Sequence, residues 1–442
     1  MELADVFGIS SRVDSASYVD RGGLDSAFQR ALASDRHIAV HGGSKQGKSW
    51  LRAKGLPDSE TLLVQCTPRS TPATILQEAL GRLNVSATLS QSATHSIEGT
   101  LDFKGAAELG KLLGKLRAEV GGNVSGNYSA TEESAPVGQT PADLLWVALT
   151  LRASGRRLVL EDFHYMPEPA QQEFAFMLKA LGEYGLRVVI VGVWPRDHLL
   201  AYYNGDLDGR VDDIHLHWSD DELDKVVELG TQALNIRFPN EVAARMVRDA
   251  YGSVGLLQRL AEQFCIAQRI YRTVPGSYRQ WTGSGTNYLD ARRIVAAQMQ
   301  GRFQTFADNF VRGMRRLSSG LEVYRYILET VTEASDAELI AGIDSAELLS
   351  RMHSHEGAMS IRASDLTQAL ECIDKLQLKI NVNPPVVTYN RSDRKLFLAD
   401  RAFLFYRAHG ANLWPWSPGE PEIVNDLYMQ EPLDLDLDVD GG

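Results

Sequence analysis

Residues 42–49 carry the clearest chemical signal of this chain, which has 442 residues. They read G-G-S-K-Q-G-K-S, follow a short apolar stretch at 36–40, and precede a helical pattern. Glycines in such a place let backbone N–H groups curl around phosphate, and a helix N-terminus adds partial positive charge. Lys48 would reach the terminal phosphates and Ser49 would ligate Mg²⁺. The spacing predicts a phosphate-binding loop made by Gly42, Gly43, Ser44, Lys45, Gln46, Gly47, Lys48 and Ser49.

A second signal is the acidic pair Glu161 and Asp162, which ends the apolar stretch Leu158-Val159-Leu160. Such a carboxylate can hold Mg²⁺ and orient a water molecule. One alignment makes Glu161 the metal ligand and Asp162 the general base. A shift by one residue makes Asp162 the ligand, puts Phe163 at the base position, and predicts slow or absent hydrolysis. Both alignments stay open beside a plain solvated acidic pair, and the expected cofactors are ATP and Mg²⁺.

The elements that must position these residues are short apolar stretches that alternate with helical patterns. Strands are expected at 36–40, 61–66, 156–163 and 186–194. This alternation predicts an α/β fold with a parallel sheet and crossover helices. We therefore expect a nucleotide-binding core over 1–218.

The rest of the chain has a mainly helical pattern. Apolar residues at helical spacing predict a helical lid over 219–275, followed by a linker and Arg-rich segment over 276–304. Helices are expected at about 305–331, 335–350 and 363–377. Two extended runs around residues 390–393 then suit a β-hairpin, which completes a winged-helix-like domain over 305–415. Residues 416–442 form an acidic tail.

Composition restricts the class of protein. Hydrophobic residues at 44% and charged residues at 23% are globular values. Three cysteines, far apart, exclude a disulfide framework. The net charge is −12, but residues 408–442 hold eight acids and no Lys or Arg, so the acidity does not exclude nucleic acid. No leader-like or membrane-spanning run is seen, which predicts a cytoplasmic protein.

Over residues 16–275 the sequence resembles the AAA+ and STAND branch of P-loop NTPases. Residues 17–32 resemble the segment before the phosphate loop, which would place Arg21 near the adenine. Residues 204–216 resemble the segment that carries an arginine finger, which makes Arg210 the candidate for action in trans.

Two further positions follow from this resemblance. Residues 251–260 resemble the start of the lid helix, where Arg259 would be a sensor arginine. The sensor strand would be 188–193, where Gly192 replaces the usual polar residue. His164 would either sense the γ-phosphate or be a hydrogen-bonded structural histidine.

The resemblance implies an ATPase that switches with its nucleotide. Such proteins self-associate into rings or filaments and act with a partner protein, here in bacterial conflict or antiviral defence. The alternative is a DNA-loaded initiator or a transposition-regulating ATPase.

Nucleic acid is a candidate partner because nine arginines lie between Arg269 and Arg316, against two acids. Arg391, Arg394 and Lys395 add positive charge in the expected wing. Such a run can bind phosphates of DNA or RNA. It can equally form a contact surface between domains or subunits.

Residues 85–135 form an unusual insertion. Every even position from Ser86 to Asp102 is polar, whereas most odd positions are apolar, and a second alternation covers 118–131. Period-2 patterning predicts strands. We expect an antiparallel hairpin over 85–131, one strand from each alternation, joined by an amphipathic tip. It would be the effector element, inserting into a membrane on activation, docking to a partner or binding nucleic acid; a disordered loop is the alternative.

Overall fold

The computed structural model describes most of the chain. The described residues are 1–8, 16–91, 97–103, 144–194, 197–276, 279–312, 323–380, 382, 384–391, 393–411 and 414–416. They form two compact units, one made of Met1 and Leu3–Ala233, the other of Glu2 and Leu234–Gly442. The border thus lies after the first helix of the expected lid, not before it.

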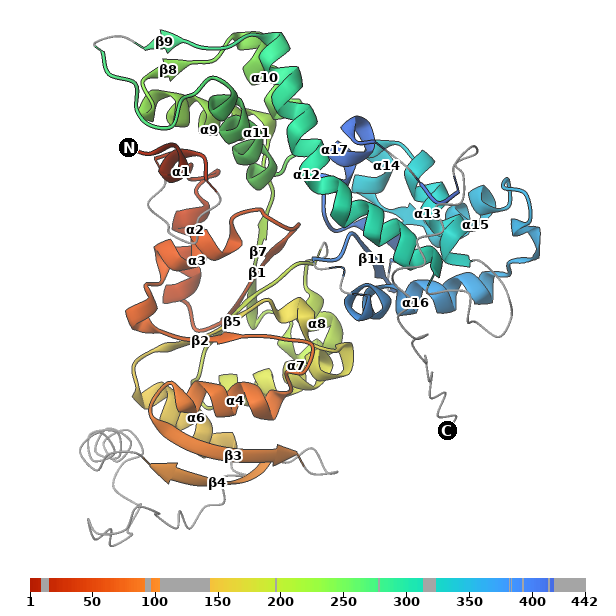
Figure 1. The fold of residues 1–442 in the computed structure, drawn as a ribbon. Coiled ribbons are helices and arrows are strands. Elements are labelled where there is room, and N and C mark those ends of the chain that lie inside the picture. The colour runs from red at the N-terminus through yellow and green to blue at the C-terminus, as the bar shows by residue number, and fades with distance from the viewer. Residues whose placement is uncertain are drawn as a thin grey trace, which may run out of the picture. The chain divides into compact units, whose positions relative to one another are not determined.

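A parallel sheet of five strands is the centre of the first unit, in the order β2-β5-β6-β1-β7 (Figure 1). Its strands are β1 (His37–Gly42), β2 (Thr61–Gln65), β5 (Arg157–Glu161), β6 (Val188–Val191) and β7 (Val211–Leu216). The first four lie where the apolar stretches predicted them, and the α/β class is confirmed. All of the β1 residues are buried, as expected for a strand covered on both faces.

Helices cover both faces of this sheet. The helices of the first unit are α1 (Leu3–Val6), α2 (Leu24–Ala33), α3 (Lys48–Gly55), α4 (Pro72–Gly81), α6 (Leu144–Ala153), α7 (Glu168–Glu183), α8 (Leu199–Tyr203) and α9 (Asp220–Ala233), with the 3-10 turns η1 (Asp58–Glu60), η2 (Phe163–Tyr165) and η3 (Gly205–Leu207). Phe28 of α2 and Leu51 of α3 share one core with Val159 of β5. Leu151 of α6 shares the core of the other face with Leu160. Successive residues of β5 therefore pack alternately on the two faces of the sheet.

The insertion begins as a short antiparallel hairpin of β3 (Val85–Gln91) and β4 (Ile97–Phe103). The single strand expected over 85–103 is thus two strands that pair with each other. The register joins Val85 to Phe103 and Gln91 to Ile97, so odd positions face odd positions. Because this pairing preserves the period-2 pattern, the alternation alone could not reveal that the segment is divided into two strands. The amphipathic tip and the second alternation lie outside the described residues.

The second unit is mainly helical. It contains α10 (Asn240–Asp249), α11 (Val254–Ala267), α12 (Gly285–Arg312), α13 (Val323–Glu333), α14 (Asp336–Ala341), α15 (Ser345–Met352), the 3-10 turn η4 (Ala358–Ser360), α16 (Ala363–Lys379) and α17 (Ala402–His409). A parallel pair is formed by β8 (Ile236–Arg237) and β9 (Gln280–Trp281). An antiparallel sheet, in the order β10-β12-β11, is formed by β10 (Ile343–Asp344), β11 (Val387–Asn390) and β12 (Lys395–Leu398).

Three expectations for this unit change in detail. Most of the expected linker over 276–304 is helical, because α12 begins at Gly285. The helix expected at 305–331 is the end of α12 and most of α13, with 313–322 outside the described part. The helix expected at 335–350 is divided by Gly342, whose φ of 84° is not helical, and by β10. The hairpin predicted around 390–393 is present as β11 and β12.

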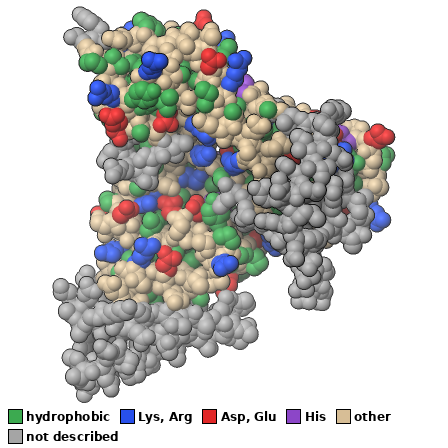
Figure 2. All heavy atoms as spheres, viewed as in Figure 1, with side chains coloured by type: hydrophobic (Ala, Val, Ile, Leu, Met, Phe, Trp, Pro, Cys, Tyr) green, Lys and Arg blue, Asp and Glu red, His purple; other side chains and the backbone are tan. Residues whose placement is uncertain are grey.

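No helix in the described part of the chain combines the length and the apolar character that crossing a membrane requires. On the face drawn in Figure 2, acidic and basic side chains are mixed with hydrophobic ones.

Candidate nucleotide-binding site

The phosphate loop joins β1 to α3, and two of its glycines have positive φ angles. Gly42 has a φ of 138°, and a Cβ there would lie 2.4 Å from the carbonyl oxygen of Leu216. Gly47 has a φ of 81° and is the N-cap of α3. Only glycine fits the first position without displacing β7, so the loop geometry explains the residue types read from the sequence.

Lys48, the first residue of α3, points back into this loop. Its Nζ donates to the carbonyl oxygen of Gly43 at 2.6 Å, and the residue is only 8% exposed. Burial lowers the pKa of the ammonium to about 8, although the negative charges of Asp162 and Glu161 oppose the change. A buried ammonium that hydrogen-bonds to loop carbonyls is a donor that phosphate oxygens can take over.

Ser49 and Glu161 meet across the site. The Ser49 hydroxyl donates to Oε2 of Glu161 at 3.0 Å. Glu161 faces α3 because it is two residues after Val159, which packs on the same face of the sheet. A hydroxyl and a carboxylate are the oxygen ligands that Mg²⁺ prefers, so these two side chains fit that ion. Of the two alignments, the geometry favours the one with Glu161 on the metal side.

Arg52 completes this contact, although it was not predicted from the sequence. Its Nε donates to Oε1 of Glu161 at 3.1 Å, and its Nη1 donates to Asp58 at 2.8 Å. Both Arg52 and Glu161 are buried. The signal was its spacing, because Arg52 is three residues after Ser49 and shares its helix face.

Asp162 lies at the turn that follows β5. It has a φ of 56°, in the left-handed region, and accepts a hydrogen bond from Nε2 of Gln65. Burial and the neighbouring Glu161 raise the pKa of Asp162, while Lys48 and Gln65 oppose the rise. A carboxylate of raised pKa, oriented by an amide, suits a general base. Gln65 was not predicted; it ends β2 opposite Glu161 in the register.

The sensor region is filled by an indole ring. A Cβ at Gly192 would lie 2.2 Å from the ring of Trp194, so the polar residue of the family pattern is sterically excluded. His164 accepts a hydrogen bond from the backbone N–H of Val193 at 3.2 Å. Burial, together with the charge of Lys48, lowers the pKa of His164 to about 3, so the imidazole is neutral.

Arg21 contacts the phosphate loop itself. It is 4% exposed, and its Nη1 donates to the carbonyl oxygen of Gln46 at 2.8 Å. Its guanidinium lies 4.3 Å from the ring centre of Trp218, whose Nε1 donates to the same carbonyl at 3.1 Å. These two side chains therefore hold the loop through the carbonyl oxygen of Gln46. Trp218 is a second residue that was not predicted from the sequence.

The two remaining candidate arginines are Arg210 and Arg259. The carbonyl oxygen of Arg210 accepts from the backbone N–H of His37, which places Arg210 beside the start of β1, away from the loop at its end. The side chain of Arg210 is 48% exposed and pairs with Glu183 at 2.5 Å. Arg259 belongs to the second unit, where Nη2 donates to Gln298 at 2.8 Å. Within its own unit, Arg210 is not part of the group formed around Lys48.

Comparison with known proteins bears on the fold. No protein-family model matches the chain, and no curated protein matches its sequence. The solved structure of the Walker-type ATPase PABY2304 of Pyrococcus abyssi matches with a TM-score of 0.50 at 13% identity, covering 91% of this chain and 98% of that one. This chain has the fold of a Walker-type ATPase.

Weaker structural matches include two DNA-related proteins. The ORC1 protein of Aeropyrum pernix, solved in complex with DNA, matches with a TM-score of 0.38 at 11% identity, covering 93% of this chain and 96% of that one. The RuvB Holliday junction branch migration motor of Thermotoga maritima matches with a TM-score of 0.34 at 10% identity, covering 87% and 93%.

Proposed function

We propose that this chain binds Mg-ATP at the phosphate loop and hydrolyses it. The observation that carries the proposal is the hydrogen bond of 3.0 Å between Ser49 and Glu161. This bond joins the start of the helix after the loop to the carboxyl end of β5. A Mg²⁺ ion bound to the phosphates needs protein oxygen ligands at these two places.

Each side chain has a defined task in this reaction. Lys48 and the loop N–H groups bind the phosphates, and Ser49 and Glu161 hold the metal. Mg²⁺, when bound, neutralises charge on the phosphoryl oxygens. Asp162 accepts the proton of the attacking water, and the amide of Gln65 holds its carboxylate in place.

The test separates binding from hydrolysis. Lys48→Ala should weaken ATP binding by roughly tenfold or more, because a charge-assisted hydrogen bond is lost. Lys54→Ala is the matched control, because Lys54 lies on the same helix but is 45% exposed and pairs with Asp25. Asp162→Asn should bind ATP normally and lower the hydrolysis rate by about 10²–10⁴. Asparagine tolerates the left-handed backbone of this position. Equal ATP affinity in the wild type and Lys48→Ala would refute the assignment.

We further propose a nucleotide-dependent switch that self-associates, with Arg210 acting in trans. Its half-exposed side chain, paired only with the exposed Glu183 among the described residues, supports this role. Arg210→Ala should lower the hydrolysis rate per chain at high protein concentration and leave ATP affinity unchanged. A rate independent of concentration in the wild type would contradict it. Action in bacterial conflict or antiviral defence stays a prediction from the sequence resemblance.

The role of the insertion also stays a prediction. We propose that the segment begun by β3 and β4 contacts a partner protein, and membrane insertion is the alternative. Deleting residues 86–135 should abolish the cellular activity while ATP binding remains. Liposome leakage by the ATP-loaded wild type would instead favour the membrane.

The DNA-loaded alternative is less well supported by the second unit. Arg302 on α12 pairs with the buried Asp400 at 2.5 Å, and Arg292 lies 3.5 Å from Asp249. Arg391 lies 3.5 Å from Glu371. These three arginines are paired inside the second unit, whereas the contact role considered from the sequence lies between domains or subunits and stays a prediction. DNA affinity that falls steeply with salt would restore the alternative.

A further inference from the structure

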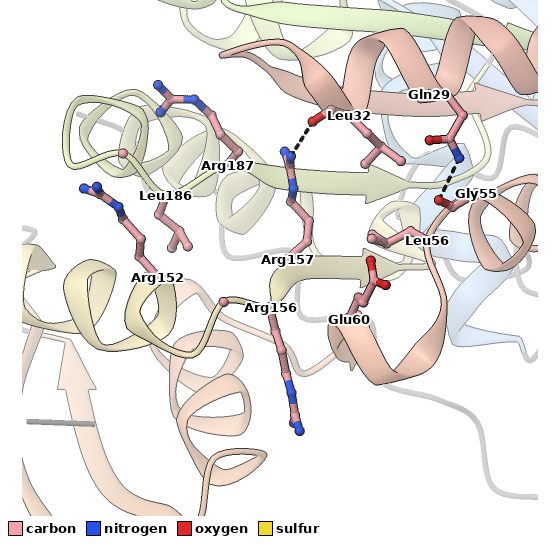
Figure 3. A pocket seen from close by; sticks show the side chains of 12 residues that line it. Gln29, Leu32, Gly55, Leu56, Glu60, Arg152, Arg156, Arg157, Leu186 and Arg187 are labelled. Atoms are coloured by element: carbon pink, nitrogen blue, oxygen red, sulfur yellow. Dashed lines mark hydrogen bonds between the residues drawn. The ribbon is translucent and has the colours of Figure 1, made fainter. Parts of the chain in front are cut away.

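The first unit has a cavity of about 410 Å³ at the end of the sheet opposite the phosphate loop (Figure 3). It is bordered by Arg157, the first residue of β5, whereas Glu161 is the last residue of that strand. Arg152, Arg156 and Arg187 also line it, and Glu60 is the single acid among the lining residues. Four arginines thus line a cavity in the size range of ligand pockets; in Figure 3 the side chains of Arg152 and Arg187 lie on one side, and that of Arg156 points away from them.

Arg156, Arg157 and Arg187 have no buried carboxylate partner among the described residues. Arg157 donates its Nη2 to the carbonyl oxygen of Leu32 at 2.8 Å, as the dashed line in Figure 3 shows. Its Nη1 is buried without a partner among the described residues. Arg187 pairs with Asp35, whose side chain is 89% exposed and therefore neutralises little. Arg156 is exposed and makes no side-chain hydrogen bond or ion pair within the described part.

The surroundings respond to this charge. Burial lowers the pKa of Arg157, and the nearby Arg187 lowers it further. Burial also lowers the pKa of His37 to about 3, with a further contribution from Arg187 and Arg157. His37 begins β1 at this same end of the sheet. Burial is the larger cause in both groups, and the positive charges of Arg187 and Arg157 add to it in the direction that an anionic ligand would oppose.

The shape of the cavity restricts the kind of anion. Leu32, Leu56 and Leu186 also line it and lie among the arginines in Figure 3. A concave site with an apolar part suits a compact ligand better than the exposed backbone of a duplex. Arginine forks match the oxygens of phosphate in geometry and charge.

We propose that this cavity binds a compact phosphorylated molecule, as a second anion site separate from the phosphate loop. Arg152 binds the phosphate from the exposed rim, Arg157 and Arg187 supply fixed positive charge beside it, and Arg156 adds charge from a greater distance. The site does not depend on nucleotide at the phosphate loop, so the two can be tested independently.

The test uses the full chain with Lys48→Ala, so that the phosphate loop does not compete, and inorganic pyrophosphate as the probe in calorimetry. Adding Arg152→Gln and Arg156→Gln should weaken pyrophosphate binding by roughly tenfold or more. The matched control is Arg30→Gln with Arg69→Gln, since both are exposed arginines of the same unit outside the cavity. The control should bind as the Lys48→Ala parent does.

Two results would overturn the proposal. One is the absence of pyrophosphate binding to the Lys48→Ala chain, and the other is equal binding with and without the Arg152 and Arg156 substitutions. The surface would be assigned to nucleic acid if the Lys48→Ala chain bound no pyrophosphate and the Arg152 and Arg156 substitutions abolished its binding of duplex DNA. With Lys48 intact, ATP affinity should be unchanged by the Arg152 and Arg156 substitutions, so a failure here is distinct from a failure of the ATPase assignment.

Discussion

Replacing Arg52 by methionine tests the buried contact that positions Glu161. Methionine keeps the unbranched length of the side chain and removes its charge. Side-chain exposure is 8% for Arg52 and 7% for Glu161, and Nε lies 3.1 Å from Oε1. The substitution therefore leaves a buried carboxylate whose remaining described partner is the Ser49 hydroxyl.

The expected magnitude follows from that burial. Removing one partner of a buried ion pair costs about 3–5 kcal/mol of unfolding free energy. The chain supplies its own control in Arg36 and Asp212, which are separated by a similar 3.0 Å but are 52% and 25% exposed. An exposed pair contributes about 0–1 kcal/mol, so Arg36→Met should have a small effect.

Equilibrium urea denaturation of the full chain measures the free energy of unfolding of both variants. Glu161→Gln combined with Arg52→Met should recover part of the loss, because the unpaired charge is then absent. Mg-ATP should also stabilise Arg52→Met more than the wild type, since the metal replaces the missing positive charge. If Arg52→Met cost no more than Arg36→Met, the ion pair would not be the element that holds Glu161.

Three further outcomes are expected at the same site. ATP binding requires the ammonium form of Lys48, whose pKa is lowered to about 8, so affinity should hold below that pH and fall about tenfold per unit above it in titrations with a nucleotide analogue. Gly192→Asn should cost about 1–3 kcal/mol in thermal denaturation, because its Cβ would lie 2.2 Å from the Trp194 ring, and Trp194→Ala should partly rescue it. Trp218→Leu removes the 3.1 Å hydrogen bond to Gln46 and should weaken ATP binding by roughly three- to tenfold; unchanged affinity would show that the loop holds itself.

The sequence predicted those parts of the candidate site whose residues are neighbours in the chain. The phosphate loop, its strand and its helix are adjacent in the chain, so spacing alone located Lys48 and Ser49. The choice between Glu161 and Asp162 needed the structure, because it depends on which face of β5 looks toward α3. Gly192 looked like the loss of a sensor residue, and only the packed ring of Trp194 explains why the position must be glycine.

The two clearest fold differences have different causes. The division of residues 85–103 into β3 and β4 could not be predicted from the sequence, because a register that pairs odd with odd positions preserves the alternation. The start of α12 was readable, since Tyr288, Ala291, Val295, Met299 and Phe303 are buried at helical spacing. The residues before α12 are rich in Gly, Ser and Thr, which favours a linker, and this composition masks the periodicity of the helix that follows.

The position of β6 between β1 and β5 sets a length scale for the site. Neighbouring strands are about 4.8 Å apart, so the strand that leads into the phosphate loop and the strand that ends in the carboxylates are separated by about 10 Å. Ser49 nevertheless reaches Glu161, so the start of α3 lies over the intervening strand β6. An occupant held between the loop and the carboxylates would therefore lie next to Gly192 and Val193, the two residues that follow β6, and a change in that occupant would reach this part of the backbone first.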